Sequence, residues 1–206
     1  MVHRRALLGV LLVGAGLLVA THLVLYWIHY HVGEVPWLVR QLFDLDEENN
    51  LPTWFSSFLL LLAAGFVHLT AESEPRDRGW WRVLAAGFVV LSLDEVAGLH
   101  ETLNTAVSFN WALPGAVVAL AAGVAFVPFL RRLERPTALL YLAAGALYVG
   151  GAVGVELLAA DMDVDTFAYA GATAVEEGME MFGAWLFLWA TLARGAGRLR
   201  VEVAVD

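Results

Sequence analysis

Apolar runs long enough to cross a membrane recur along the whole chain of 206 residues. A transmembrane helix needs about 20 mostly apolar residues in succession. A soluble domain would carry about 25% charged residues, whereas this chain carries 16%. The runs do not alternate between apolar and polar residues, which excludes strands of a membrane barrel. The sequence therefore predicts an all-α integral membrane bundle, a single transmembrane domain over residues 1–206. The six predicted spans are Ala6–Ile28, Thr53–Thr70, Trp80–Leu103, Trp111–Leu130, Thr137–Ala160 and Phe167–Ala193.

The basic residues predict how this bundle is oriented. All 12 are arginine, and every one except Arg40 falls on the same side of the six predicted spans. The links on the opposite side are acidic, as at Glu34 and Asp161. Because positively charged links stay in the cytoplasm, we expect both termini to be cytoplasmic and the protein to lie in the cell inner (plasma) membrane.

A further segment, between the first two spans, is too charged to cross the membrane. Glu34–Leu51 carries both acidic and large apolar side chains, including Trp37 and Phe43. This pattern indicates a short amphipathic helix on the outer surface of the bilayer.

Composition excludes several classes of function. The net charge of −9 offers no basic face for nucleic acid. The chain has no cysteine, so it has neither disulfides nor thiolate metal ligands. It also has no lysine, which excludes an enzyme or a retinal protein built on a lysine imine.

Acidic side chains inside the predicted spans give the main indication of function. An ionised carboxylate in hydrocarbon costs several kcal/mol unless it is paired, protonated, bound to a metal or in contact with water. By depth along their helices, these groups fall in the outer half of the membrane, so we expect them to face a common interior pocket. They are Asp94, Glu95, Glu101, Glu156, Glu176, Glu177 and Glu180, with His100 beside them.

The first interpretation of this cluster is a site for a divalent metal ion, either zinc, iron or manganese. Carboxylate and imidazole groups on facing helices bind such ions in helical bundles. The protein would then be a metal-dependent membrane enzyme acting on a membrane-soluble substrate, with Asp94 or Glu101 as general base on metal-bound water. The candidate metal ligands are His22, Glu95, His100, Glu156, Glu176, Glu177 and Glu180.

Other interpretations of the same residues stay open. Carboxyl groups in a wet cavity also relay protons or bind cations, as in a small proton- or cation-coupled transporter. Protonated carboxyl groups can instead fasten helices to one another. A third function is that of a non-catalytic subunit that binds a membrane protein partner through its acidic outer surface.

Two resemblances accompany these interpretations. Residues 50–57 (NLPTWFSS), 91–101 (LSLDE to HE) and 176–181 (EEGMEM) resemble a group of uncharacterised multi-pass membrane proteins of prokaryotes. That resemblance implies a helical membrane fold and no known activity. Residues 100–103 are also similar to the histidine segment of ceramidase-type membrane hydrolases, which bind zinc, and Ser56 or Ser57 matches their serine. Glu176 and Glu180 stand where that family has paired histidines.

Small residues in the fifth predicted span indicate close helix packing. This span carries Gly145, Gly150, Gly151 and Gly154. Gly150 and Gly154 among them have the G-x-x-x-G spacing that lets two helix backbones approach each other.

Overall fold

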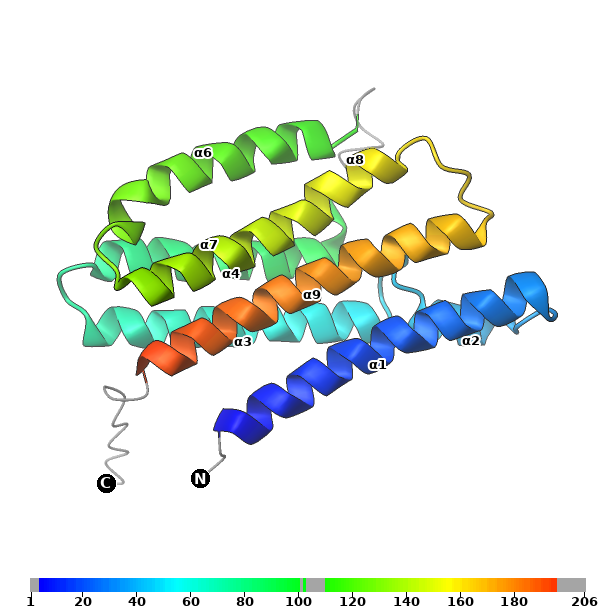
Figure 1. The fold of residues 1–206 in the computed structure, drawn as a ribbon, viewed down its shortest axis with the longest axis horizontal. Coiled ribbons are helices and arrows are strands. Elements are labelled where there is room, and N and C mark those ends of the chain that lie inside the picture. Colours follow the sequence, from blue (N-terminus) through cyan, green and yellow to red (C-terminus); the bar gives the residue numbers. More distant parts are fainter. Residues whose placement is uncertain (1–3, 101, 103–109, 196–206) are drawn as a thin grey trace.

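The computed structural model describes residues 4–100, 102 and 110–195. Within these residues the chain forms helices and no strand. The long helices lie side by side as a bundle, with α2 near one end (Figure 1). The elements are α1 (Arg4–His31), α2 (Trp37–Phe43), α3 (Leu51–Ser73), α4 (Arg78–Ala97), α6 (Ala112–Leu130), α7 (Arg135–Val149), the π-helix η1 (Gly150–Val155), α8 (Glu156–Ala159) and α9 (Phe167–Gly195).

Four helical stretches are long and apolar enough to cross a membrane: α1, α3, α6 and the continuous stretch Arg135–Ala159. They coincide with four of the predicted spans, which supports a helical membrane protein with several spans. The other two predicted spans correspond to α4 and α9. These helices are of similar length but carry the acidic residues, so their composition alone does not mark them as spans.

The α4 helix is shorter than the predicted third span. It ends at Ala97, and Gly98 follows in the left-handed conformation with φ of 55°. The Gly98 N–H donates to the Asp94 carbonyl at 2.8 Å, which closes the helix. Glycine adopts this conformation without the steric cost that a Cβ would bring.

Contacts between helix ends gather the arginines at one end of the bundle. Arg4, at the start of α1, donates to the carbonyl of Leu192, near the end of α9, at 3.3 Å. Arg132, after α6, pairs with Asp77, before α4, at 3.0 Å. In Figure 1 the α3–α4 and α6–α7 links lie at this end of the bundle, and the α1–α2 and α8–α9 links, which carry the acidic residues Glu34 and Asp161, lie at the opposite end.

The same end is closed by a further ion pair. The Arg194 guanidinium at the end of α9 makes two short hydrogen bonds to the Glu74 carboxylate, at 2.7 and 2.8 Å. Glu74 also accepts a hydrogen bond from the indole of Trp81 at 3.2 Å, and Arg194 lies over that indole ring. A bidentate pair of this kind fixes orientation as well as distance, so it joins α9 to the link between α3 and α4.

The amphipathic helix predicted between the first two spans is present as α2. None of its residues is buried, and Trp37 and Leu38 are among its exposed apolar side chains. The position of this helix on a bilayer surface stays a prediction.

Hydroxyl groups bind α3 to α4. The Ser57 and Ser92 hydroxyls are 2.8 Å apart, and each also donates to the other residue's carbonyl. Both side chains are buried. Small residues with reciprocal hydrogen bonds allow two helices to pack closely inside a membrane.

A close backbone approach joins α9 to α7 and η1. A Cβ added to Gly151 would lie 2.6 Å from the Glu176 carbonyl oxygen. One added to Gly183 would lie 2.8 Å from the Tyr148 nitrogen. Of the two glycines in the G-x-x-x-G spacing, Gly150 faces α9, since its added Cβ would lie 2.9 Å from the Met179 Cε, whereas Gly154 has open space at its Cβ position. The glycines that permit the backbone contact are therefore Gly151, one of the small residues predicted to mark close packing, and Gly183.

We expect Gly151→Ala and Gly183→Ala to destabilise the protein by about 1–3 kcal/mol, because the new methyl group overlaps backbone atoms that cannot move aside. The matched control is Gly154→Ala, which adds the same methyl group to open space and improves helix propensity. Thermal unfolding in detergent should show a lower midpoint for the first two variants. Equal midpoints for Gly151→Ala and Gly154→Ala would contradict this packing.

Candidate functional site

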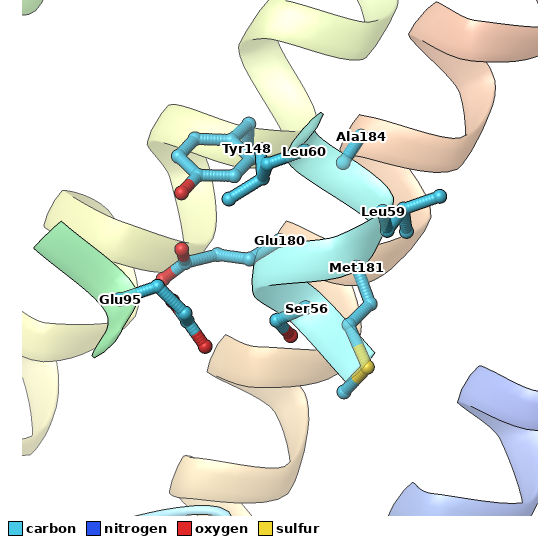
Figure 2. A pocket seen from close by; sticks show the side chains of 8 residues that line it. All are labelled: Ser56, Leu59, Leu60, Glu95, Tyr148, Glu180, Met181 and Ala184. Atoms are coloured by element: carbon cyan, nitrogen blue, oxygen red, sulfur yellow. The ribbon is translucent and has the colours of Figure 1, made fainter. Parts of the chain in front are cut away.

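Two of the predicted acidic residues share a small cavity inside the bundle (Figure 2). Glu95 comes from α4 and Glu180 from α9, and both are half-buried. The cavity volume is about 10 Å³, which is room for roughly one water molecule. Its lining residues are Ser56, Leu59, Leu60, Glu95, Tyr148, Glu180, Met181 and Ala184.

The glycine contact described above determines where Glu180 lies. The Glu180 Cγ is 3.1 Å from the position that a Cβ of Gly151 would occupy. The glutamate side chain thus runs directly across the π-helix towards α4 and Tyr148 (Figure 2). A larger residue at position 151 would occupy this path.

Tyr148 completes the polar side of the cavity. Its hydroxyl points to the Glu180 carboxyl in Figure 2 and interacts with it. Glu180 is also within electrostatic reach of Glu95 and Glu176. The site therefore places a phenol and several carboxyl groups together.

A third carboxyl group, that of Glu177, lies close to this site. Glu177 interacts electrostatically with Glu180, Glu95 and Glu176. Among the described residues, no arginine forms an ion pair with Glu177, Glu180 or Glu95. Like charges in an apolar bundle repel one another strongly, so this group of carboxyls requires protons or a cation for neutralisation.

Asp94 and His100 form a separate pair where α4 ends. The His100 Nδ1 lies 3.1 Å from the Asp94 carboxylate, and the His100 backbone N–H donates to the same carboxylate at 3.1 Å. About 30% of each side chain is exposed. His100 also acts electrostatically on Glu95 and Glu176. The Asp94–His100 pair therefore lies at the edge of the cluster of glutamate side chains and not within it.

Glu156 lies at the start of α8 and contacts a different neighbour. Its carboxylate accepts a hydrogen bond from the Asn110 side chain at 3.0 Å. It is also within electrostatic reach of Glu176. Glu156 is therefore near the edge of the site, and it links α8 to the residues just before α6.

His22 lies apart from the cavity, and its two ring nitrogens are both engaged. Nδ1 accepts the Leu45 N–H at 3.0 Å, so it carries no proton. Nε2 then donates to the Ala170 carbonyl at 3.2 Å. The side chain is 1% exposed and lies 3.4 Å from Asp44. His22 fastens α1 to α9 and to the link after α2, so it would have to release one of these hydrogen bonds to bind a metal.

Sequence reasoning did not foresee the role of the residues around His22. The Asp44 carboxylate accepts a hydrogen bond from the Tyr26 hydroxyl, and Asp46 accepts one from Tyr169 at 3.0 Å. We call residues 44–50 the outer strap, after the side of the membrane on which the sequence predicts them. Asp46 acts electrostatically on Glu176 and Glu177 of the site. The sequence signal for these contacts is the presence of Tyr26 and Tyr169 near the ends of α1 and α9, within otherwise apolar runs.

The predicted metal centre has no counterpart in the part of the chain that the structure describes. There, no group of three or more histidine, aspartate or glutamate side chains is arranged to hold a metal ion. Glu101, a predicted general base, lies outside the described residues. The roles of Asp94 and of the predicted ligands in metal chemistry stay predictions.

Comparison with protein families assigns this chain to a family. The family described as Domain of unknown function (DUF8692) matches residues 7–195. Since the match covers most of the chain, the protein belongs to this family. Comparisons with curated proteins and with solved structures find no match.

We expect His22→Leu to destabilise the protein by about 1–3 kcal/mol, because the substitution leaves the Leu45 N–H and the Ala170 carbonyl without a partner. His68→Leu is the control, since His68 is exposed. Thermal unfolding in detergent measures both. A His22→Leu midpoint equal to that of the control would show that these hydrogen bonds do not hold the outer strap.

Proposed function

We propose that this protein is a six-span membrane protein that binds protons or small cations at the carboxyl site and carries them across the bilayer. In this proposal α4 and α9 cross the membrane together with the four apolar stretches. Support comes from their place in the bundle: they lie alongside the candidate spans in Figure 1. Their Glu95 and Glu180 side chains line a small cavity between helices. In this position the two carboxyl groups avoid the free-energy cost of facing lipid.

The proposed orientation places the arginine-rich end in the cytoplasm and the outer strap on the external side. Support comes from the gathering of basic links at one end of the bundle and from the preference of such links for the cytoplasm. The protein would then lie in the plasma membrane with both termini inside, and its carboxyl site would be nearer the external face.

Labelling of single cysteines tests this orientation, because the chain contains no cysteine of its own. The exposed positions Glu34 and Asp161 should react with a membrane-impermeant maleimide in intact cells after substitution by cysteine. The exposed positions Arg76 and Glu134 should react only after lysis. The reverse pattern would invert the proposed topology, and labelling at all four positions in intact cells would reject it.

One observation carries the proposed function: the carboxyl groups of Glu95, Glu177 and Glu180 lie within electrostatic reach of one another without an arginine counterion among the described residues. Such an arrangement is costly inside an apolar bundle. The three carboxyl groups are stable together when protons or a cation neutralise them. Release and rebinding of these ions would make the site a carrier. A role in fastening the helices would not need three carboxyl groups, because single polar side chains serve that purpose elsewhere in the bundle, as at Ser57.

The other sequence-based functions have less support. A metal-dependent enzyme needs at least three ligands around its ion, and the described residues contain no such group. Binding of a membrane protein partner rests on the acidic outer surface alone. Both remain predictions, and metal analysis of the purified protein tests the first.

We expect Glu180→Gln to lower proton or cation flux into liposomes by about tenfold or more, because the amide neither ionises nor replaces a carboxylate as cation ligand. Glu134→Gln is the matched control, since Glu134 is exposed and its side chain caps no helix. Internal pH dyes and radioactive Na⁺ uptake measure the two fluxes. Unchanged flux in a correctly folded Glu180→Gln variant would reject transport through this site.

A further inference from the structure

One arginine departs from the segregation of basic residues to the opposite end of the bundle. Arg40 lies in α2, at the acidic end. Within the described residues its guanidinium forms no ion pair, and its Nε–H is buried without an acceptor. The guanidinium carbon lies over the Tyr26 ring, 5.7 Å from the ring centre. A buried donor without an acceptor costs about 1–3 kcal/mol. Arg40 is therefore held against α1 while its donors suit an acceptor that these residues do not provide.

The surface of α2 around Arg40 is apolar. Trp37 and Leu38 are 67% and 70% exposed, and Leu42 is 45% exposed. Trp37 precedes Arg40 by three residues, so the two share one side of the helix. Tryptophan next to a cation on a short amphipathic helix suits the level of lipid headgroups, where the ring meets the acyl chains and the cation meets phosphate. A soluble anion would use the arginine but not the apolar surface beside it.

Carboxylates near Arg40 restrict the charge of the headgroup. Tyr30, near the end of α1, is within electrostatic reach of Arg40 and also of Asp163 and Asp165, which lie in the link before α9. Both of these aspartates are exposed, and neither forms an ion pair in the part of the chain that the structure describes. They would repel a headgroup that carries only negative charge. A headgroup with a phosphate and an amine complements both signs.

We propose that α2 and the link before α9 bind a phospholipid with a zwitterionic headgroup, with its phosphate on the Arg40 guanidinium and its amine facing Asp163 and Asp165. Arginine donates two parallel hydrogen bonds to a phosphate, so Arg40 positions the headgroup. Trp37 and Leu38 contact the acyl chains. This inference goes beyond the proposed carriage of ions at the carboxyl site and does not depend on it; the proposed orientation determines only that the lipid belongs to the outer leaflet.

Thermal unfolding of the purified protein in a mild detergent measures this binding. Phosphatidylethanolamine, phosphatidylglycerol or inorganic phosphate is added over the same range of concentrations. A ligand that binds only the folded state raises the midpoint in a saturable way. We expect that rise with phosphatidylethanolamine, a smaller one with phosphatidylglycerol and none with inorganic phosphate. No rise with phosphatidylethanolamine, or a rise as large with either of the other two, would overturn the proposal.

Two arginine variants separate binding at α2 from general stabilisation by lipid. Arg40→Gln should weaken phosphatidylethanolamine affinity by about tenfold, because it removes the charge that meets the phosphate. Arg131→Gln is the matched control, since Arg131 is exposed at the arginine-rich end, and it should leave the affinity unchanged. Arg40→Gln also loses the contact with Tyr26, so each variant is compared with its own midpoint without lipid. Equal affinity in Arg40→Gln and wild type would overturn the assignment.

A double variant, Asp163→Asn with Asp165→Asn, tests the choice of headgroup. Asparagine retains the side-chain oxygen that Asp163 offers to the Asp165 N–H, so the link can keep its conformation without the two charges. We expect the ratio of phosphatidylethanolamine affinity to phosphatidylglycerol affinity to fall by about tenfold. An unchanged ratio would show that these aspartates do not face the amine, and it would overturn the assignment of a zwitterionic headgroup.

Discussion

The close approach of α9 to α7 and η1 is the contact on which the rest of the bundle depends. Gly151 and Gly183 allow backbone atoms of these helices to come within a distance that any side chain would prevent. This contact directs Glu180 across the π-helix towards Tyr148 and Glu95. The position of the carboxyl site is thus determined by the absence of two side chains. Contacts of this kind are common between membrane helices, where apolar burial does not distinguish a neighbouring helix from lipid.

The two ends of the bundle are fixed by different chemistry. At the arginine-rich end, an ion pair between Arg194 and Glu74 joins α9 to the link between α3 and α4. At the other end the outer strap is held by neutral and charge-assisted hydrogen bonds, including those of His22 and Tyr169. Since the strap carries Asp46 towards Glu176 and Glu177, the same hydrogen bonds that close this end also add negative charge near the site.

The helices could be predicted from the sequence because each apolar run is long enough to determine a helix by itself. The segregation of the arginines to one end followed from the same runs. The partners of the acidic side chains could not be predicted, because the rotation of each helix is set by contacts between helices. Glu95 and Glu180 do share a cavity as expected, whereas His22 is committed to Leu45 and Ala170. Of the glycines that the fifth predicted span offered, Gly150 and Gly151 face α9 and Gly154 does not, since spacing alone does not reveal which face of a helix meets a neighbour.

The π-helix has a mechanical consequence for the span in which it lies. A π-turn contains one residue more than an α-turn, so the part of the span beyond η1 is rotated by roughly 100° relative to an unbroken α-helix. Tyr148 precedes this offset and serves the cavity, whereas Glu156 follows it and receives the amide of Asn110. The two halves of this helical span can therefore contact two different neighbours. Removing one residue from η1 would turn Glu156 away from Asn110 and leave Tyr148 in register.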